Sequence, residues 1–539
     1  MIGPLGGCIV GPLLLAAACL LLPSRLARWF ALAGGLGVLG CGALLVADFA
    51  ARPGADFRWL EQHDWSRAFG AAFTFGVDGP AALMLLLAGL TTAIATVAAW
   101  QQSDRPRLYH ALVLVLLAAL AAVFTALDLL LFYVAWEAVL LPMLPLIGLF
   151  GGEQRRYAAT KFFVYTLAAS VMLLAVLLLL WNSQPADGRS VAVPSVVAAA
   201  HVDPVHGTLH GLVLQGPAAA PRVHVPRGFD LRHLALQADA FAAVPLFGTT
   251  LAVLGLLAVL LACLVKLPAV PLHTWLPHAH VQAPTAVSVL LAGVLLKLGV
   301  FGLWRIGLPL FPSAAAAAAP ALGALGLAGI LWGAWAALGQ SDLKRLVAYA
   351  SVSHLGFCLL GLASGTAAGI AGALVFSFAH GLSSALLFLL VGVLYDRAHH
   401  RRADGFGGLA RPMPVFAWLL LLGALAGASL PALAVFPGEF LVLTASFTAA
   451  APFPAFAAAA TLSGILSAAY LLWTVKRVAY GPLRHGEQAA FGDCDGRERA
   501  ALLPVAVLLV VFGLWPKPLV DAVRPACELL AALLQGRSA

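Results

Sequence analysis

Charged residues are scarce in this sequence of 539 residues: Asp, Glu, Lys and Arg together make up 10% of it, whereas hydrophobic residues make up 62%. Soluble domains carry about a quarter charged residues, so this composition excludes an ordinary water-soluble enzyme. Disordered chains are poor in apolar residues, so disorder is excluded as well. The mean hydropathy of +0.97 predicts a polytopic membrane protein.

Closely spaced cysteines are also absent. The seven cysteines are scattered along the chain, and no CxxC pair occurs. Iron–sulfur clusters and structural zinc sites need clustered thiolates, so the spacing argues against both within this chain and indicates no disulfide framework. No P-loop motif is present, so there is no case for transport driven by ATP. We therefore expect no cofactor in this chain.

Long apolar runs recur along the whole sequence. A membrane helix needs about 20 mainly apolar residues, and about fourteen runs meet this requirement. The first six lie near residues 2–22, 29–50, 81–100, 109–127, 129–150 and 162–181. After a polar interruption, the others lie near residues 246–267, 285–310, 320–338, 346–364, 368–395, 414–448, 455–477 and 501–522. The sequence therefore predicts an all-α fold with about fourteen transmembrane helices.

The charges of the connections predict the orientation. Connections after spans four, eight, ten and twelve are almost free of Lys and Arg, whereas basic residues gather after odd-numbered spans. These basic residues are Arg25, Arg28, Arg105, Arg107, Arg155, Arg156, Lys344, Arg345, Arg397, Arg401, Arg402, Arg411, Lys476, Arg477 and Arg484. The positive-inside rule places such connections in the cytoplasm, so both termini are expected on the other side. This pattern explains the formal net charge of +8 without nucleic-acid binding.

Two connections are longer than the rest. Residues 51–80 mix basic and acidic side chains, which suits an ordered exterior cap. Residues 182–240 are rich in Ala, Pro and His, and the histidines are His201, His206, His210, His224 and His233. Their spacings match no common metal-ligand pattern, so a flexible exterior loop is the better interpretation and metal binding is the alternative.

Six ionisable residues lie in or beside the apolar runs. They are Glu137, Lys266, Lys297, His354, His380 and Glu439. A charged side chain at the centre of a bilayer costs about 2.5–3.5 kcal/mol on insertion scales, and such residues usually line ion or proton paths. The alternative for each residue alone is a structural pairing between helices. Lys161 and Arg305 lie near span ends, where their long side chains can reach the interface.

Prolines interrupt the helices at two of these residues. Pro268 and Pro271 follow Lys266, and Pro431 and Pro437 precede Glu439. Each proline removes a helical hydrogen bond, and broken backbone in a membrane is tolerated only where it is buried or lines a wet cavity. One interrupted span in each half of a transporter is a pointer to an ion site. Spans four to eight and nine to thirteen are accordingly interpreted as two related bundles.

The residue types favour proton movement over sodium binding. Sodium needs several oxygen ligands, whereas carboxylate, ammonium and imidazole groups exchange protons. In this hypothesis a Glu137–Lys266 pair opens and closes, which loads a proton onto Lys297. The proton then passes by way of His354 or His380 to Glu439.

Several motifs resemble those of the antiporter-like membrane subunits of respiratory complex I, and among them the M-type (chain 4) subunits of NADH:quinone oxidoreductase. The resemblance runs from about residue 57 to about residue 520. The motifs are FRWLEQHDW, FGVDG, FYVAWEAVLLPM, ATKFFVYT, VKLPAVPLHTWLPHAHVQAPTAVSVLLAGVLLKLGVFGLWR, SDLKRLVAYASVSHLGF and FPGEF.

The resemblance implies two inverted five-helix bundles with discontinuous helices 7 and 12. It implies an N-terminal three-helix segment at residues 1–108, bundles at 109–310 and 311–480, and a cytoplasmic loop with the last helix at 481–539. By motif it assigns the proton path to Glu137, Lys266, Lys297, His354, His380 and Glu439. Flavin, iron–sulfur clusters and quinone are then expected in partner subunits.

The implied function is proton translocation in the bacterial inner membrane, coupled to NADH-to-quinone electron transfer in other subunits. The implied partners are adjacent antiporter-like subunits and the lipid bilayer, and both termini are expected in the periplasm. Two departures stand out: His278 replaces the usual aspartate in WLPDAH, and the 182–240 insertion is longer than expected. The absence of a long lateral helix after span fourteen argues against an L-type subunit.

Two other functions remain open. One is a subunit of a multi-chain sodium/proton antiporter or of a hydrogenase-type membrane complex, because such proteins share this fold. The other is a structural membrane scaffold, in which the buried charges only hold helices together.

Overall fold

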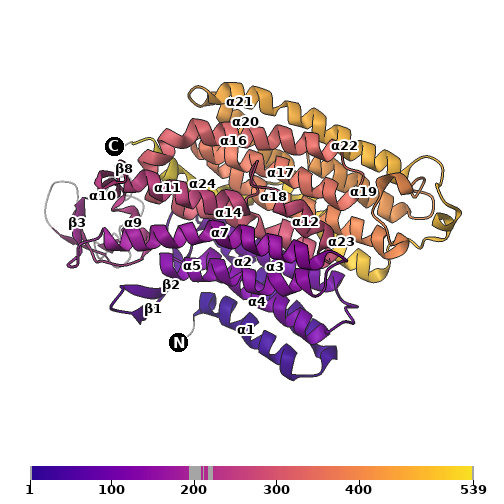
Figure 1. The fold of residues 1–539 in the computed structure, drawn as a ribbon, viewed down its shortest axis with the longest axis horizontal. Coiled ribbons are helices and arrows are strands. Elements are labelled where there is room, and N and C mark those ends of the chain that lie inside the picture. The colour runs from indigo at the N-terminus through magenta and orange to yellow at the C-terminus, as the bar shows by residue number, and fades with distance from the viewer. Residues whose placement is uncertain (1–2, 193–207, 210–211, 216–221, 537–539) are drawn as a thin grey trace.

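The computed structural model describes residues 3–192, 208–209, 212–215 and 222–536. Figure 1 shows a bundle whose long helices run roughly along one direction, with the helix at residues 4–21 on one flank and the helices at residues 453–479 on the other. In the described part of the chain, eleven helices are long and apolar enough to cross a membrane, or twelve if one bent pair is counted as a span. The predicted all-α polytopic membrane architecture is confirmed.

The first half of the bundle contains helices up to residue 310. They are α1 (Pro4–Leu21), α2 (Ser24–Ala51), α3 (Gly79–Ala98), α4 (Pro106–Thr125), α5 (Leu129–Ala138), α6 (Leu140–Gly148), α7 (Arg155–Asn182), α9 (Leu231–Ala235), α10 (Ala238–Ala243), α11 (Leu251–Lys266), α12 (Trp275–Gln282), α13 (Thr285–Leu290), the π-helix η1 (Leu291–Leu295), α14 (Lys297–Gly302), the π-helix η2 (Leu303–Gly307) and α15 (Leu308–Leu310).

The second half continues to residue 534. Its helices are α16 (Pro312–Leu338), α17 (Leu343–Ala363), α18 (Ala367–Ala398), the 3-10 helix η3 (Ala403–Gly405), α19 (Pro414–Gly427), α20 (Val435–Thr448), α21 (Phe453–Ala460), α22 (Leu462–Ala479), the 3-10 helix η4 (Gly486–Ala490), α23 (Gly496–Leu514) and α24 (Lys517–Leu534).

Short antiparallel strands cover one end of the bundle, which we call the strand end (Figure 1). The strands are β1 (Arg58–Ser66), β2 (Ala71–Val77), β3 (Arg189–Ala192), β4 (Thr208–Leu209), β5 (Leu212–Gln215), β6 (Arg222–Val225), β7 (Pro245–Leu246) and β8 (Thr249–Thr250). β1 pairs with β2, β7 pairs with β8, and the other four form a sheet in the order β3-β6-β5-β4. Both labelled chain ends lie on this side of the bundle.

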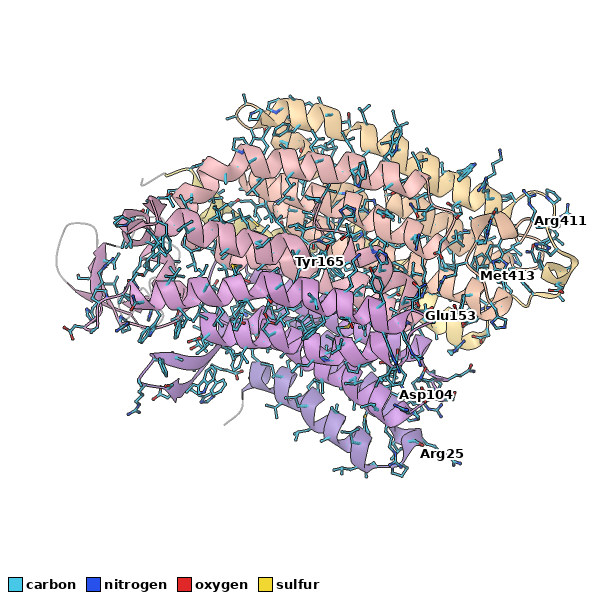
Figure 2. The ribbon with its side chains drawn as sticks, viewed as in Figure 1. Arg25, Asp104, Glu153, Tyr165, Arg411 and Met413 are labelled. Atoms are coloured by element: carbon cyan, nitrogen blue, oxygen red, sulfur yellow. The ribbon has the colours of Figure 1, made fainter. Side chains whose placement is uncertain are left out.

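The opposite end holds the connections that the sequence predicted to be cytoplasmic. Arg25, Asp104, Glu153, Arg411 and Met413 lie together there in Figure 2, and we call this the basic end. The two ends therefore separate the basic connections from the strands and the termini, as the alternating charge pattern requires.

Acidic N-caps define where several helices begin. Asp78 accepts a hydrogen bond from the Ala81 amide at 2.9 Å at the start of α3, and Asp128 accepts from the Leu130 and Leu131 amides at the start of α5. Asp342 does the same for α17. These carboxylates satisfy amides that have no partner within the helix, so the polar residues at span edges fix the helix starts.

The core is centred on α18. Every residue of α18 from Gly369 to Leu394 is buried, and the segment from α13 to α15 is equally enclosed. In contrast, α1, α2, α7, α16 and α22 carry exposed apolar side chains on their outer faces. A helix that is hydrophobic all round belongs in an interior, and a helix with an exposed apolar face suits contact with lipid or neighbouring subunits.

Three predicted spans differ from the structure. The run 414–448 is two helices, because α19 ends at Gly427 and α20 begins at Val435. The helix of the run 246–267 begins only at Leu251, because β7 and β8 occupy the residues before it. The run 501–522 is bent, since α23 ends at Leu514 and α24 leaves at 66°. Pro516 and Pro518 explain that last break. The count of fourteen and the numbering of helices 7 and 12 stay predictions.

Part of the 182–240 connection is regularly folded, against the expectation of a flexible loop. Residues 222–243 form β6, α9 and α10. The Leu129 amide donates to the Phe229 carbonyl at 2.8 Å, and the Leu231 amide donates to the Leu127 carbonyl at 2.8 Å. This segment is therefore fixed to the start of α5. Three histidines of the alternative metal-binding interpretation, His201, His206 and His210, lie outside the described residues.

Candidate functional site

Lys266 is the last residue of α11 and is 5% exposed. Its ammonium group donates to the Trp136 carbonyl at 3.0 Å and lies 3.9 Å from the centre of the Trp136 ring. Glu137 follows Trp136 on α5, and its charge acts on Lys266. Among the described residues, however, Oε1 of Glu137 has no hydrogen-bond partner, and no ion pair within 4.0 Å joins it to Lys266. The two residues are therefore neighbours in an open arrangement.

Lys297 begins α14 and is completely buried. Its ammonium group lies 2.9 Å from Nδ1 of His380 and also donates to the Ala292 carbonyl. His380 belongs to α18 and is likewise buried. A lysine from one bundle thus contacts a histidine of the other inside the protein core.

An irregular backbone brings this lysine and histidine together. The π-helix η1 ends just before Lys297, and π-helical turns inside α-helices are frequent at functional sites. Next to His380, a Cβ atom on Gly381 would lie only 2.8 Å from the Gly293 carbonyl oxygen of η1. Glycine at 381 therefore permits the close approach that places His380 against Lys297.

His354 of α17 extends the cluster. Its ring and the His380 ring are close to perpendicular, with centroids 5.1 Å apart. Nε2 of His354 lies 3.0 Å from the carbonyl oxygen of Gly427, the last residue of α19. Because a carbonyl only accepts, Nε2 must carry a hydrogen, and Nδ1 of the neutral ring is left as the acceptor.

Glu439 lies beyond the break between α19 and α20. The Ser429 hydroxyl, two residues after Gly427, donates to Oε2 of Glu439. Ser429 has φ of 54°, in the left-handed region, as part of the turn that follows α19. Tyr470 of α22 is fully buried, and in the described structure its hydroxyl has no hydrogen-bond partner.

The structure places the six predicted residues in three groups: a cluster of three residues, Glu439 by itself, and a pair. Lys297, His380 and His354 form one cluster, and the turn at Gly427 and Ser429 connects it to Glu439. Lys266 and Glu137 form another group around Trp136. Within the described ranges, no direct hydrogen bond joins Lys266 to Lys297. That step would need water or movement of a side chain.

Two further buried groups were not predicted from the sequence. Lys344, expected in a cytoplasmic loop, is 3% exposed in the first turn of α17, and it donates to the Ala283 carbonyl at 2.7 Å. His280, on α12, is fully buried. The signal that could have found Lys344 was Asp342, since an N-cap at that position puts Lys344 inside the helix.

The interfacial position expected for Arg305 is wrong. Arg305 is 7% exposed, and its guanidinium donates to Asp78 at 2.8 Å. Folding brings these two residues together although they lie 227 positions apart in the sequence. Lys161, by contrast, is only half-buried and lies 3.4 Å from Nδ1 of His278.

No group of three or more His, Cys, Asp or Glu side chains is arranged to hold a metal in the part of the chain that the structure describes. All seven cysteines are free, and none is bonded to another. The groups in contact at the site are ammonium, imidazole, hydroxyl and carboxylate, which can accept, hold and release protons.

Comparison with known proteins assigns this architecture. The family model for the membrane domain of NADH:quinone oxidoreductase and the Mrp antiporter matches residues 126–203 and 230–465, more than half of the chain. The chain belongs to this family. All six predicted site residues fall within the matched ranges.

Individual relatives span nearly the same length. An NAD(P)H-quinone oxidoreductase chain 4 of Synechococcus is 37% identical over 98% of this chain and 94% of its own. Subunit M of the NADH-quinone oxidoreductase of Rhodobacter capsulatus is 35% identical over 93% of this chain and 90% of its own.

A solved structure agrees with these relatives. A chain of respiratory complex I from Thermus thermophilus, solved with bound NADH, superimposes with a TM-score of 0.80 at 31% identity, covering 98% of this chain and 99% of that chain. The resemblance found in the motifs is confirmed, and it extends over the whole fold.

Proposed function

We propose that this chain is a proton-translocating membrane subunit of an NADH:quinone oxidoreductase, coupling electron transfer in other subunits to proton movement across the membrane. Its relatives in Synechococcus and Rhodobacter capsulatus carry the matching names. The observation that carries the proposal is the 2.9 Å contact between the buried Lys297 ammonium and Nδ1 of His380. The hydrogen-bond contacts of this ammonium among the described residues are His380 and the Ala292 carbonyl, and neither is a carboxylate, so the pair is not an ordinary ion pair.

The hydrogen-bond directions favour proton transfer from Lys297 towards His354. When Lys297 is protonated, its ammonium can only donate, so Nδ1 of His380 accepts and the neutral ring carries its hydrogen on Nε2. A proton that arrives at Nδ1 makes an imidazolium, which can release the other hydrogen. His354 is held by the Gly427 carbonyl with its Nδ1 free to accept. Each ring can therefore take a proton at one nitrogen and release one at the other.

Glu439 is the proposed exit from this cluster, and Glu137 with Lys266 is the proposed control at the other end. Ser429 connects Glu439 to the turn that holds His354. Lys266 lies within the influence of Glu137 but donates to a backbone carbonyl instead. Closing the Glu137–Lys266 pair would stabilise the protonated form of Lys266. A protonated Lys266 disfavours a second positive charge nearby. Moving one charge through about 150 mV costs about 3.5 kcal/mol, and a change of pairing inside a membrane is of the same order.

The proposal also covers the cofactors, the neighbouring subunits, the orientation in the membrane and the division of the chain. Flavin, iron–sulfur clusters and quinone would be held by other subunits, and adjacent antiporter-like subunits and lipid would cover the exposed apolar faces. We place the basic end in the cytoplasm and both termini in the periplasm of a bacterial inner membrane. The chain then divides into residues 1–108, the bundles 109–310 and 311–480, and the segment 481–539.

The test uses the purified complex in proteoliposomes, with NADH oxidation and internal acidification measured together. Lys297→Ala should lower the proton-translocation rate at least about a hundredfold, the lower end of the range for a positioned proton-transfer group. Lys297→Arg should fail as well, because arginine does not deprotonate in proteins. Lys517→Ala is the matched control, since Lys517 is exposed and pairs only with Asp521 in the described structure. Unchanged translocation in assembled Lys297→Ala complex would support the scaffold function instead.

A subunit of a multi-chain antiporter is the second candidate, because the family model covers the Mrp antiporter as well. The genes beside this one separate the two functions. Genes for NADH- and quinone-binding subunits support the oxidoreductase, and a compact antiporter operon supports the alternative.

A further inference from the structure

His280 has two buried ring nitrogens that lack any hydrogen-bond partner among the described residues. An imidazole always carries at least one N–H, so at least one buried donor is unsatisfied. Leaving a buried polar group without a partner is costly. Buried groups of this kind are normally satisfied by an internal water. Both edges of the His280 ring are therefore positions for bound water.

The ring of His280 is held firmly. It stacks on Phe388 of α18 with centroids 4.4 Å apart and planes at 10°. The His280 carbonyl also accepts a hydrogen bond from Ser288 at 3.3 Å. Stacking covers a face of the His280 ring, so Phe388 does not cover the two nitrogens at the ring edge.

The charged groups around His280 belong to the cluster already described and to Lys344. Lys344 donates to the carbonyl of Ala283, which lies three residues after His280. Phe388, on which the His280 ring stacks, belongs to α18, the helix that also carries His380. His280 thus packs against the helix of the Lys297–His380 pair and lies on the segment that a second buried lysine holds.

Lys344 connects this region to the basic end. The charges that act on it are those of Arg401, Asp342 and Asp396. Asp396 lines a cavity of about 190 Å³, together with Gln102, Tyr109, Thr285, Arg497 and Glu498. Thr285 lies two residues after Ala283, whose carbonyl accepts from Lys344. The cavity therefore reaches the chain segment that Lys344 holds.

We propose that His280 and Lys344 are further proton-path residues, which carry protons from the Asp396 cavity at the basic end to Lys297. This inference rests on the proposed function. A proton from solvent in the cavity protonates the Lys344 amine, and Lys344 passes a proton through water to one nitrogen of His280. The other nitrogen releases a proton through water to the Lys297 amine. No bond between heavy atoms changes. Each transfer leaves the His280 hydrogen on the nitrogen that faces Lys344, so the ring returns to its first tautomer, by rotation or by exchange through water, before the next proton.

Lys344 also has a structural role, because α12 ends at the carbonyls of Val281 and Ala283. Arg401 donates to the Val281 carbonyl at 2.9 Å and Lys344 to the Ala283 carbonyl at 2.7 Å. Cations at the end of a helix stabilise it. Lys344→Arg separates the two roles: it keeps the charge and the donor to Ala283, but it cannot release a proton.

The experiment measures proton uptake and NADH oxidation by the complete complex in proteoliposomes. His280→Phe keeps an aromatic ring for Phe388 and removes both nitrogens. His110→Phe is the matched control, since His110 is a buried histidine of α4 with an unpartnered Nδ1 in the described structure and no place in the path. His280→Phe and Lys344→Arg should each lower proton translocation about tenfold or more, whereas His110→Phe should leave it unchanged.

The inference is overturned if His280→Phe and Lys344→Arg both translocate at the control rate while Lys297→Ala does not. If Lys297→Ala also translocates normally, the proposed function itself fails. Should His280→Phe not assemble, His280→Gln and His280→Ala replace it. Recovery of translocation by added imidazole in His280→Ala supports the relay. Imidazole supplies a proton carrier, so such recovery would not be expected if His280 served packing alone. Normal translocation in both replacements overturns it.

Discussion

Arg305 and Asp78 form a buried ion pair that joins the start of α3 to the π-helix η2. The guanidinium and carboxylate are 2.8 Å apart, and their side chains are 6% and 5% exposed. Asp78 also caps α3 through the Ala81 amide. One carboxylate therefore fixes a helix start and neutralises a cation whose removal from water is expensive.

Breaking this pair should destabilise the protein without acting on the proton path. Asp78→Asn keeps a capping oxygen but leaves the guanidinium unpaired, and loss of one partner of a buried pair costs about 3–5 kcal/mol. Thermal unfolding of the purified complex, with the amount of assembled complex, measures the effect. Asp78→Asn combined with Arg305→Met should recover part of the loss, because no unpaired charge then remains. A double variant that is as unstable as Asp78→Asn alone would contradict this account.

His380 and His354 should contribute unequally to proton movement. His380 contacts the Lys297 ammonium directly, whereas His354 meets only the edge of the His380 ring. A water can replace His354 as the acceptor from His380 more easily than it can replace His380 as the acceptor from Lys297. His380→Gln should therefore lower proton translocation about a hundredfold and His354→Gln about tenfold. His110→Gln serves as the control in the same liposome measurement. A larger loss in His354→Gln than in His380→Gln would contradict the proposed order.

The six candidate site residues could be singled out because each lies in or beside an apolar run, and burying a charge in lipid is costly; their part in proton transfer stays a proposal. Their partners could not, because they come from distant parts of the chain. Nothing near Arg305 in sequence indicates Asp78, which lies 227 positions away. An end-of-span position therefore suggested an interfacial arginine, and the tertiary fold made it a buried one.

His280 and Lys344 show a second limit. His280 follows a proline-interrupted segment, so the sequence suggests a loop, and only packing on Phe388 buries its ring. Lys344 belongs to a basic connection by charge but to the helix by its Asp342 N-cap. Charge patterning gives the side of the membrane for a connection, but it does not say which of its residues fold inward.

The Ser429 hydroxyl should influence the rate at which Glu439 releases a proton. Its hydroxyl donates to Oε2 of Glu439 from a residue with φ of 54°. Ser429→Ala removes the donor and keeps the unfavourable backbone, whereas Ser429→Gly removes the donor and relaxes the backbone. If the hydroxyl matters, both variants should slow proton release by a similar factor, about tenfold to a hundredfold, since one hydrogen bond to a charged group contributes about 1.5–3 kcal/mol. Ser364→Gly is the control, at a serine whose hydroxyl bonds to the Gly361 carbonyl and to Thr366 but to no residue of the proposed path. Loss in Ser429→Ala with none in Ser429→Gly would assign the effect to backbone strain instead.

Asp128 should make stability depend on pH. It lies just outside the membrane-spanning part of α5, and burial raises its pKa to about 6, against the opposing effect of amide hydrogen bonds from Leu131, Ala72 and Leu130. The folded protein therefore binds the Asp128 proton more tightly than the unfolded chain, in which this carboxyl has its ordinary pKa of 3.8. The stability due to this tighter binding is fully present below pH 3.8. It falls as pH rises towards about 6, by about 3 kcal/mol in total, and is constant above it.

Asp128→Asn should remove this slope, because the amide does not titrate between about pH 4 and about 6. Unfolding midpoints of the wild-type and variant complexes across this range measure the difference. Asp104→Asn is the control, since Asp104 lies on an exposed connection at the basic end and has no buried partner in the described structure. The wild-type and Asp104→Asn proteins should lose stability in parallel as pH rises, and Asp128→Asn should lose less. A variant curve parallel to the wild-type curve would mean that Asp128 ionises in the folded protein as easily as in water, and that its amide hydrogen bonds fully offset its burial.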